Sequence, residues 1–285
     1  MIQKKIVEFL KNEGIELFSF LSLDECIITK KYLLDRIGIT SGSAVIIAVP
    51  YVSDDFSLGN ISEYAKPRDY HIFFSSLFAQ LTQKLKSEFP DFTFVGFADH
   101  SPIDERHAAA LSGLGVIGKN GLLLTEKYSS FVFLGELITD SPLSSDAGEI
   151  KYCSGCQKCV SHCPSSRLQK FGCLSAVTQK KYALSDEEAA LMCDFGTVWG
   201  CDACQTVCPY TERALKRGTL FTNIPFFKEK RISVLTYRLV SEMSDEEFSE
   251  RAYSWRGRET ILRNLSIYEN RPMEDDTCAK QNEIN

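Results

Sequence analysis

In the N-terminal half of the chain, stretches with helical spacing of apolar residues alternate with short, continuously apolar stretches. The first helix is expected over residues 2–13, where Ile2, Ile6, Phe9 and Leu10 recur on one helical face. Further helices are expected over 24–37, over 69–88 and from about 102, and strands over 15–23, 43–52, 92–98, 121–125 and 130–139. Alternating elements of this kind predict an α/β layer domain.

The pattern changes at about Asp140, where Ser, Asp and Gly replace the apolar runs and a cysteine-rich stretch begins. A helix is expected inside this stretch, near 185–195, and amphipathic helices follow it, among them 232–243 and 260–268. We therefore expect four parts: an α/β domain over 1–142, a cysteine-bearing domain over 143–212, a helical segment over 213–270 and a frayed tail over 271–285.

The net charge and the lengths of the apolar runs limit where the protein can be located and what it can bind. The longest apolar run, about Ala44 to Tyr51, is too short for the ~20 residues of a membrane helix, and the charged N-terminal helix does not resemble a signal peptide. The chain has 32 Lys and Arg against 38 Asp and Glu, a formal charge of −6, which disfavours unselective binding to nucleic acid or anionic membrane. We expect a cytoplasmic monomer with no membrane partner.

Cysteine is the unusual component, because nine of the eleven cysteines lie between Cys153 and Cys208. In a reducing cytosol such a cluster indicates metal ligands or catalytic groups rather than disulfides. The first run has the spacing C-x2-C-x2-C-x3-C-P, and the second has C-x2-C-x3-C-P. This is the spacing of bacterial two-cluster ferredoxins, in which the fourth cysteine of a run binds the other cluster.

Crossed ligation assigns the cysteines to two [4Fe-4S] clusters. The first set is Cys153, Cys156, Cys159 and Cys208, and the second is Cys163, Cys201, Cys204 and one further cysteine. We favour Cys173 for that last ligand, with Cys193 as the alternative. Zinc is the alternative metal, since C-x2-C pairs also build tetrahedral sites, but zinc would not need the third cysteine and the proline of each run.

A glycine-rich loop lies upstream of the cysteines. Its residues Gly113, Gly115, Gly118 and Lys119 match G-x-G-x-x-G-K by letter. A nucleotide-binding fingerprint should follow a strand and open a helix, whereas here a helical stretch precedes the glycines and a strand follows them. We therefore interpret the glycines as a tight loop that lets the backbone approach a large ligand.

Several motifs occur together in one order: EYAKPRDYH at 63–71, DHSPIDER at 99–106, GLGVIGKNGLLL at 113–124, SFVFLGELITD at 130–140 and GCDACQTVCP at 200–209. Together they resemble the epoxyqueuosine reductase family. The resemblance implies an oxidoreductase that uses base-off cobalamin and two [4Fe-4S] clusters to reduce epoxyqueuosine to queuosine in tRNA. It implies an α/β or α+β architecture: a cobalamin-binding domain related to the nitroreductase-like fold, a ferredoxin-like double-cluster domain and a short helical tail.

The resemblance also suggests roles for individual residues. Asp99 matches the proton donor, and burial under a corrin ring would raise the pKa of its carboxyl group; the alternative role is to cap a helix. The positions matched to cofactor binding are Arg68, His71, Arg106, Gly115, Gly118, Lys119 and Asn120. We expect no histidine on cobalt, because Phe74 stands where the cobalt-binding histidine motif has a glycine.

The resemblance is weakest after Pro209, where relatives continue into a helical-repeat domain that helps to hold tRNA. Here 13 basic and 13 acidic residues follow, so this part of the chain has no net charge with which to attract a phosphate backbone. The partners expected are tRNA and an electron donor such as reduced ferredoxin or flavodoxin. Two other functions stay open: a cobalamin and iron-sulfur reductase of another small substrate, as in reductive dehalogenases, and an electron-transfer protein without a corrin.

Overall fold

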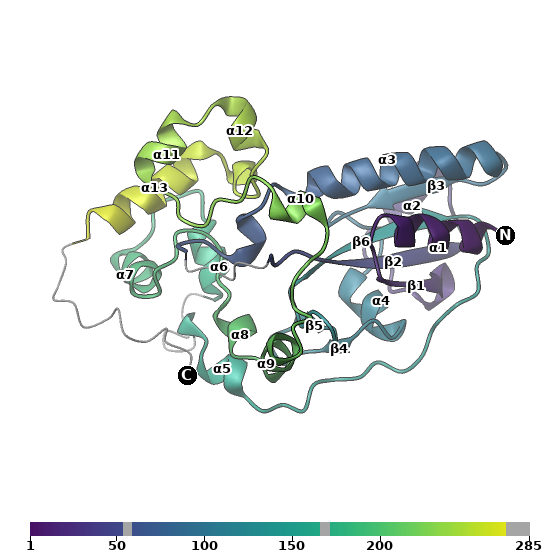
Figure 1. Ribbon diagram of the computed structural model, residues 1–285, viewed down its shortest axis with the longest axis horizontal. Helices are drawn as coiled ribbons and strands as arrows, with labels where there is room; N and C mark the ends of the chain where they lie inside the picture. Colours follow the sequence, from purple (N-terminus) through teal and green to yellow (C-terminus); the bar gives the residue numbers. More distant parts are fainter. Residues whose placement is uncertain (54–58, 166–171, 272–285) are drawn as a thin grey trace.

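The structure is a computed structural model that describes residues 1–53, 59–165 and 172–271. A β-sheet and its helices form one end of an elongated molecule, and a group of helices forms the other (Figure 1). The cysteine-bearing segment runs along the lower edge between them. The predicted tail over 271–285 lies, apart from Arg271, outside the described residues. Among the described helices, none is both long and apolar enough to cross a membrane.

The main sheet has four strands, all antiparallel to their neighbours. Their order is β1 (Leu17–Ser22), β2 (Ser43–Pro50), β6 (Val132–Thr139) and β3 (Phe94–Phe97). Of the two fold classes expected, α+β is therefore the one found. The connection between β1 and β2 carries α2 (Lys31–Ile37), a helix only ~10 Å long, and returns the chain antiparallel to β1.

Helices cover both faces of this sheet. On one face α1 (Ile2–Asn12) and α3 (Tyr70–Glu88) pack on Val45, Ile47 and Val49 of β2. On the other, α2 and α4 (Glu105–Leu111) pack on Ala44 and Ile46. Because alternate residues of β2 face opposite layers, the whole strand is buried, which explains its continuous apolar run.

The expected helix over 24–37 is interrupted in the structure. A 3-10 turn, Leu23–Glu25, closes with a capping box between Ser22 and Glu25, and α2 begins only at Lys31. The backbone N–H groups of Thr29 and Lys30 both donate to the carbonyl of Pro102, at 2.9 and 3.1 Å. This tertiary contact draws the chain away from a continuous helix.

The remainder of the chain is mostly helical. Short strands β4 (Val116–Ile117) and β5 (Leu123–Leu124) form a hairpin before the cysteines. The helices after it are α5 (Lys158–Ser161), α6 (Leu174–Thr178), α7 (Asp186–Asp194), α8 (Ala203–Thr206), α9 (Pro209–Lys216), α10 (Pro225–Lys228), α11 (Tyr237–Glu242), α12 (Asp245–Ser249) and α13 (Arg258–Glu269). Further 3-10 turns cover Glu63–Ala65 and Ser254–Arg256.

Two hydrophobic cores cross the boundaries predicted at 142 and 212. Leu220, Ile224 and Phe227 pack into the core beneath α1 and α3. Ile61 and Ala65 pack into a second core with residues of the 198–265 region. The division into domains stays a prediction, and the segment after 212 is packed on both of the parts that precede it.

Candidate functional site

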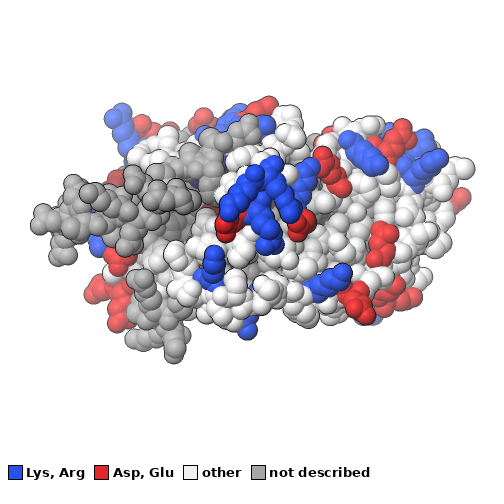
Figure 2. All heavy atoms as spheres, turned by 60° about the horizontal axis from the view of Figure 1, so that its bottom comes forward, with Lys and Arg blue, Asp and Glu red and all other residues white. Residues whose placement is uncertain are grey.

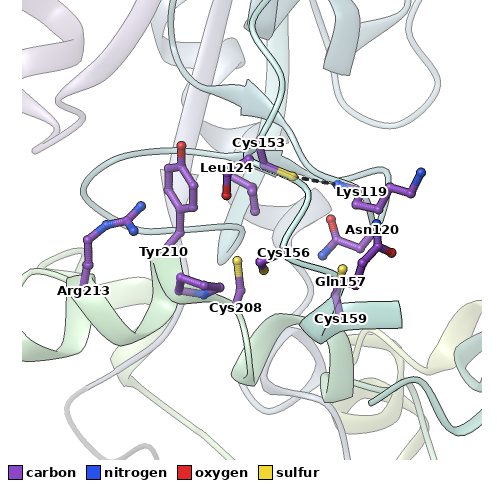
Figure 3. A pocket seen from close by; sticks show the side chains of 12 residues that line it. Lys119, Asn120, Leu124, Cys153, Cys156, Gln157, Cys159, Cys208, Tyr210 and Arg213 are labelled. Atoms are coloured by element: carbon purple, nitrogen blue, oxygen red, sulfur yellow. Dashed lines mark hydrogen bonds between the residues drawn. The ribbon is translucent and has the colours of Figure 1, made fainter. Parts of the chain in front are cut away.

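The first predicted set of cluster cysteines lines one cavity of about 210 Å³ (Figure 3). Cys156 and Cys159 flank the start of α5, and Cys208 is the N-cap of α9. Cys153 completes the set and accepts a hydrogen bond from the backbone N–H of Lys119, at 3.3 Å. The fold therefore brings Cys208 to the three cysteines of the first run, as crossed ligation requires.

The second predicted set also lies together. Burial is the main cause that raises the pKa of Cys201 to about 12 and that of Cys204 to about 11. The charge of Cys173 raises both pKa values further, and the charge of Cys163 adds to that of Cys204. The four thiols thus lie within electrostatic reach of one another.

Cys193, the alternative eighth ligand, is in different surroundings. It packs beside Leu174 and Val177, and burial raises the pKa of its thiol. The charged groups acting on Cys193 are Arg271 and Asp194 rather than a cluster cysteine. Of the two candidates, Cys173 is the one that the fold brings to Cys201 and Cys204. Across the described residues, no three His, Cys, Asp or Glu side chains converge closely enough for a single metal ion.

Asp99 lies at the centre of a hydrogen-bonded group at the end of β3. The Tyr70 hydroxyl donates to Oδ2 of Asp99, and Nε2 of His71 lies 3.5 Å from the same oxygen. The other ring nitrogen, Nδ1 of His71, lies 2.8 Å from Oδ1 of Asp69. Asp69 is also the N-cap of α3 and accepts the backbone N–H of His71 at 2.9 Å. One carboxylate therefore both caps the helix and orients the imidazole.

Two hydrogen bonds determine the charge state of Asp99. The hydrogen bond from His71 holds the pKa of Asp99 below its ordinary value, and that of Tyr70 acts in the same direction against the effect of burial. Hydrogen bonds to Asp69 and Asp99 raise the pKa of His71 to about 10. The raised pKa expected for Asp99 applies to a site closed by a corrin ring, whereas the hydrogen bonds of the protein alone lower this pKa. In this structure the carboxylate is ionised and the proton is held on His71.

A buried pair of carboxyl groups lies near Asp99, and no motif in the sequence predicted it. Glu136 on β6 is fully buried, and no donor among the described residues completes a hydrogen bond to either of its carboxyl oxygens or to Oε2 of Glu105. Burial raises the pKa of Glu105 to about 7 and that of Glu136 well above its ordinary value, and the charge of Asp99 raises both further. Two adjacent buried carboxyl groups cannot both ionise, so the pair holds a proton.

Most of the positions matched to cofactor binding are engaged within the protein. A Cβ atom at Gly115 would lie 2.6 Å from the carbonyl of Leu124, and one at Gly118 would lie 2.4 Å from the side chain of Asn120. These glycines therefore permit the close packing of the β4–β5 hairpin.

The charged and polar positions matched to cofactor binding make contacts in different parts of the protein. Arg68 stacks on Phe226 at 4.3 Å and lies 3.8 Å from Glu229. Nη1 of Arg106 donates to the carbonyl of Gly121 at 2.9 Å. Lys119 and Asn120 line the cavity of the first cysteine set. His71 is thus the matched cofactor position that contacts Asp99 directly.

The surroundings of His71 fit a cobalamin that carries no histidine on cobalt. Both of its ring nitrogens face carboxylate oxygens, so neither is available to a metal. The side chains of His71 and Asp99 are 49% and 58% exposed, which leaves the acid-base group open to a ligand. Their hydrogen-bonding atoms suit the amide groups at the edge of a corrin ring.

The second cysteine set is connected to the acid-base group through one short segment. Asp202, between Cys201 and Cys204, is half-buried and accepts hydrogen bonds from the Ser62 hydroxyl and the Glu63 backbone N–H, at 2.5 and 2.7 Å. The next residue, Tyr64, is acted on by the charges of Asp202, Asp69 and Asp99. Tyr64 therefore lies within electrostatic range of both Asp202, beside the second cysteine set, and Asp99.

Comparisons with known proteins agree with this arrangement. Residues 152–211 match the family described as a 4Fe-4S double cluster binding domain. The epoxyqueuosine reductase of Gloeobacter violaceus is 34% identical over 194 residues, which cover 66% of this chain and 61% of the relative. The chain spans less than two thirds of the first relatives that it matches.

Solved structures give the same result. The epoxyqueuosine reductase of Streptococcus thermophilus matches with a TM-score of 0.75 at 25% identity, over 94% of this chain and 80% of that one. An epoxyqueuosine reductase with an epoxyqueuosine-modified tRNA-Tyr stem loop matches with a TM-score of 0.74, also at 25% identity and over the same shares of the two chains. The resemblance found in the motifs is confirmed, and the chain is a relative of these enzymes.

Proposed function

We propose that this relative of the epoxyqueuosine reductases is a cytoplasmic, cobalamin-dependent iron-sulfur oxidoreductase that reduces epoxyqueuosine in tRNA to queuosine. The observation that carries the proposal is that the second of two neighbouring cysteine sets contacts, through Asp202, the segment that includes Tyr64 and leads to the Asp99 group. Such a site can deliver electrons and protons to the same bound substrate.

The reaction sets the requirements for the site. Removing the epoxide oxygen breaks two C–O bonds, forms one C=C bond and releases water, so it consumes two electrons and two protons. The clusters would pass the electrons one at a time. Bound cobalamin would supply the low-valent centre that reduces the substrate carbon, next to Asp99 and His71.

The protons would pass through Asp99. Its carboxylate is ionised at rest, and the imidazolium of His71 lies 3.5 Å away. Transfer from His71 to Asp99 would make Asp99 the acid that protonates the leaving oxygen. Tyr70 and Asp69 would hold the two groups in line, because they hydrogen-bond to Asp99 and His71 from opposite sides.

The test is turnover of an epoxyqueuosine-containing tRNA stem loop by the anaerobically purified, reconstituted protein. Asp99→Asn should retain about eight irons and the affinity for cobalamin but lose turnover. Asp91→Asn, at an exposed position that precedes β3, is the matched control and should be fully active. Full activity of Asp99→Asn would refute the acid assignment.

Two further results would overturn other parts of the proposal. If a deletion strain accumulates no epoxyqueuosine in its tRNA, the substrate is wrong, and a different small substrate becomes the better hypothesis. If the protein binds iron and sulfide without any affinity for cobalamin, it is an electron-transfer protein.

A further inference from the structure

We propose that the basic surface beside the first cysteine set is the docking face for an acidic, one-electron carrier protein, which delivers electrons to the first cluster. This surface, the cationic rim, consists of Lys119, Lys158, Arg213, Lys216 and Arg217. The inference rests on the proposed function, since it requires that the clusters are present. It goes further by assigning where electrons reach the protein and what delivers them.

Position is the first argument. Lys119 and Arg213 line the first cavity together with Cys153, Cys156 and Cys208, and Figure 3 shows these two basic side chains on opposite sides of the cysteines. Cys156 is exposed. A cluster held here would lie close to solvent with positive charge around it, so a partner protein could approach it directly.

The order of the two cysteine sets is the second argument. Asn120 lines the first cavity and its side chain hydrogen-bonds to Cys204, so the two sets are neighbours. The second set, in turn, is connected to Asp99 through Asp202 and Tyr64. Each set has one exposed cysteine, Cys156 in the first and Cys173 in the second, but the first set has the basic side chains of the rim in its cavity, whereas the second contacts the segment that leads to Asp99. Electrons that enter at the rim would pass through both clusters before they reach the substrate.

Charge is the third argument. All five residues of the cationic rim are exposed, in a chain whose formal charge is −6. Figure 2 shows Lys and Arg side chains gathered at the centre of this face. Glu212 and Glu126 pair with Lys216 and Arg217 at 2.7 and 2.5 Å, but exposed pairs of this kind are weak and exchange easily with a partner's carboxylates. The rim keeps an excess of positive charge, which attracts an acidic protein from a distance.

Exposed apolar side chains favour a protein over an RNA backbone at this face. Tyr152, beside Cys153, is 72% exposed, Val160 on α5 is 42% exposed and Leu215 on α9 is 38% exposed. An interface that combines apolar side chains with a charged rim is typical of protein partners. A phosphate backbone would gain from the lysines and arginines but not from these three residues.

The test measures how fast the clusters of the reconstituted holoprotein are reduced, by stopped-flow absorbance. The donors are reduced flavodoxin, an acidic one-electron carrier, and dithionite, a small reductant. We expect Lys216→Glu with Arg217→Glu to slow reduction by flavodoxin at least about tenfold at low ionic strength, and to leave reduction by dithionite unchanged. Added salt should slow the reduction of the native protein by flavodoxin and have little effect on the reduction of this variant.

A matched control comes from two other exposed ion pairs within helices. Lys31→Glu with Arg238→Glu changes the net charge equally and removes the pairs with Asp35 and Glu242, far from the cysteines in the chain. This control should be reduced at the native rate. Equal slowing of both variants would overturn the docking face, and so would a variant that loses tRNA stem-loop affinity while its reduction by flavodoxin is unchanged. Failure of the proposed function is distinct, because a protein without clusters would show no absorbance change with dithionite.

Discussion

Replacing Glu136 by Gln should remove part of a pH-dependent loss of stability. Glu136 is paired through β6 with Phe97 of β3, and its side chain points to the sheet face that α4 covers, where Glu105 lies. The substitution keeps the size of the side chain and removes one of the two acids. The amide introduced by the substitution can also donate to Glu105, which the ionised native pair cannot do.

The magnitude follows from the pKa of Glu105. Burial, aided by the charge of Asp99, raises this pKa from 4.5 to about 7 in the folded protein. A difference of about 2.5 units corresponds to about 3 kcal/mol. Because the folded state keeps a proton that the unfolded chain has released, the stabilising contribution is complete below pH 4.5 and is lost as the pH rises through 7. Glu136 adds to this loss in the same direction.

The assay is anaerobic urea unfolding of the cluster-loaded protein at pH 5, 6, 7 and 8, followed by circular dichroism. We expect the native free energy of unfolding to fall by at least about 3 kcal/mol over this range from this pair. The fall should be smaller in Glu136→Gln, because the titration of Glu136 is removed and the new amide can stabilise ionised Glu105. Glu149→Gln, at an exposed position, should retain the native pH dependence. If Glu136→Gln has the same pH dependence as the native protein, the carboxyl pair is not the source, and the reasoning is wrong.

Three further substitutions test other parts of the structure. Asp69→Asn should lower the pKa of His71 from about 10 toward 6.5, measured by NMR titration of the imidazole; an unchanged pKa would contradict the assigned network. Cys173→Ser should lower the iron content from about eight toward four per chain while Cys193→Ser leaves it unchanged, and the reverse result would make Cys193 the ligand. Gly96→Ala should cost about 1–3 kcal/mol of stability, because its Cβ would lie 2.1 Å from the Phe78 ring; Gly148→Ala, with space around it, is the control, and equal costs would refute the packing argument.

The cysteine pattern was predictable because ligand spacing is a local property. Cys153 and Cys156 lie within one turn of the chain, and the trailing prolines mark where each run ends. Whether Cys173 or Cys193 is the eighth ligand could not be predicted from local spacing. It depends on how α6 and α7 pack, and only the folded chain directs Cys193 toward Arg271. The strands β2 and β6 were predictable for the same reason, since burial on both faces produces continuous apolar runs.

The chemistry around Asp99 could not be predicted from the residues nearest to it in the sequence. The charge state of Asp99, which follows β3, is set by Tyr70 and His71 at the start of α3. Glu136 did leave a signal, as a single acid inside the apolar strand FVFLGELIT. That signal was ambiguous, because an acid in a strand usually faces solvent. Its partner Glu105 reaches it only because α4 packs on that face of the sheet.

The C-terminal helical segment has a structural role that its neutral charge did not indicate. It holds residues 62–69, which lie between Asp202 and the His71–Asp99 pair in the network of hydrogen bonds. The buried side chain of Lys66 contacts Glu63, which also pairs with Arg231 at 3.1 Å. The backbone N–H of Ile232 donates to Lys66, and that of Asp69 donates to the carbonyl of Glu250, at 2.9 and 2.7 Å.

Residues 62–69 contact the second cysteine set at one end and the His71–Asp99 pair at the other. Ser62 binds Asp202 beside the second cysteine set, and Asp69 orients His71 toward Asp99. Ser62 and Asp69 lie only seven positions apart in the chain, and the backbone hydrogen bonds of Lys66 and Asp69 with the C-terminal segment hold the stretch between them in place. The residues after 212 therefore stabilise the position of the segment that contacts both the second cysteine set and the His71–Asp99 pair.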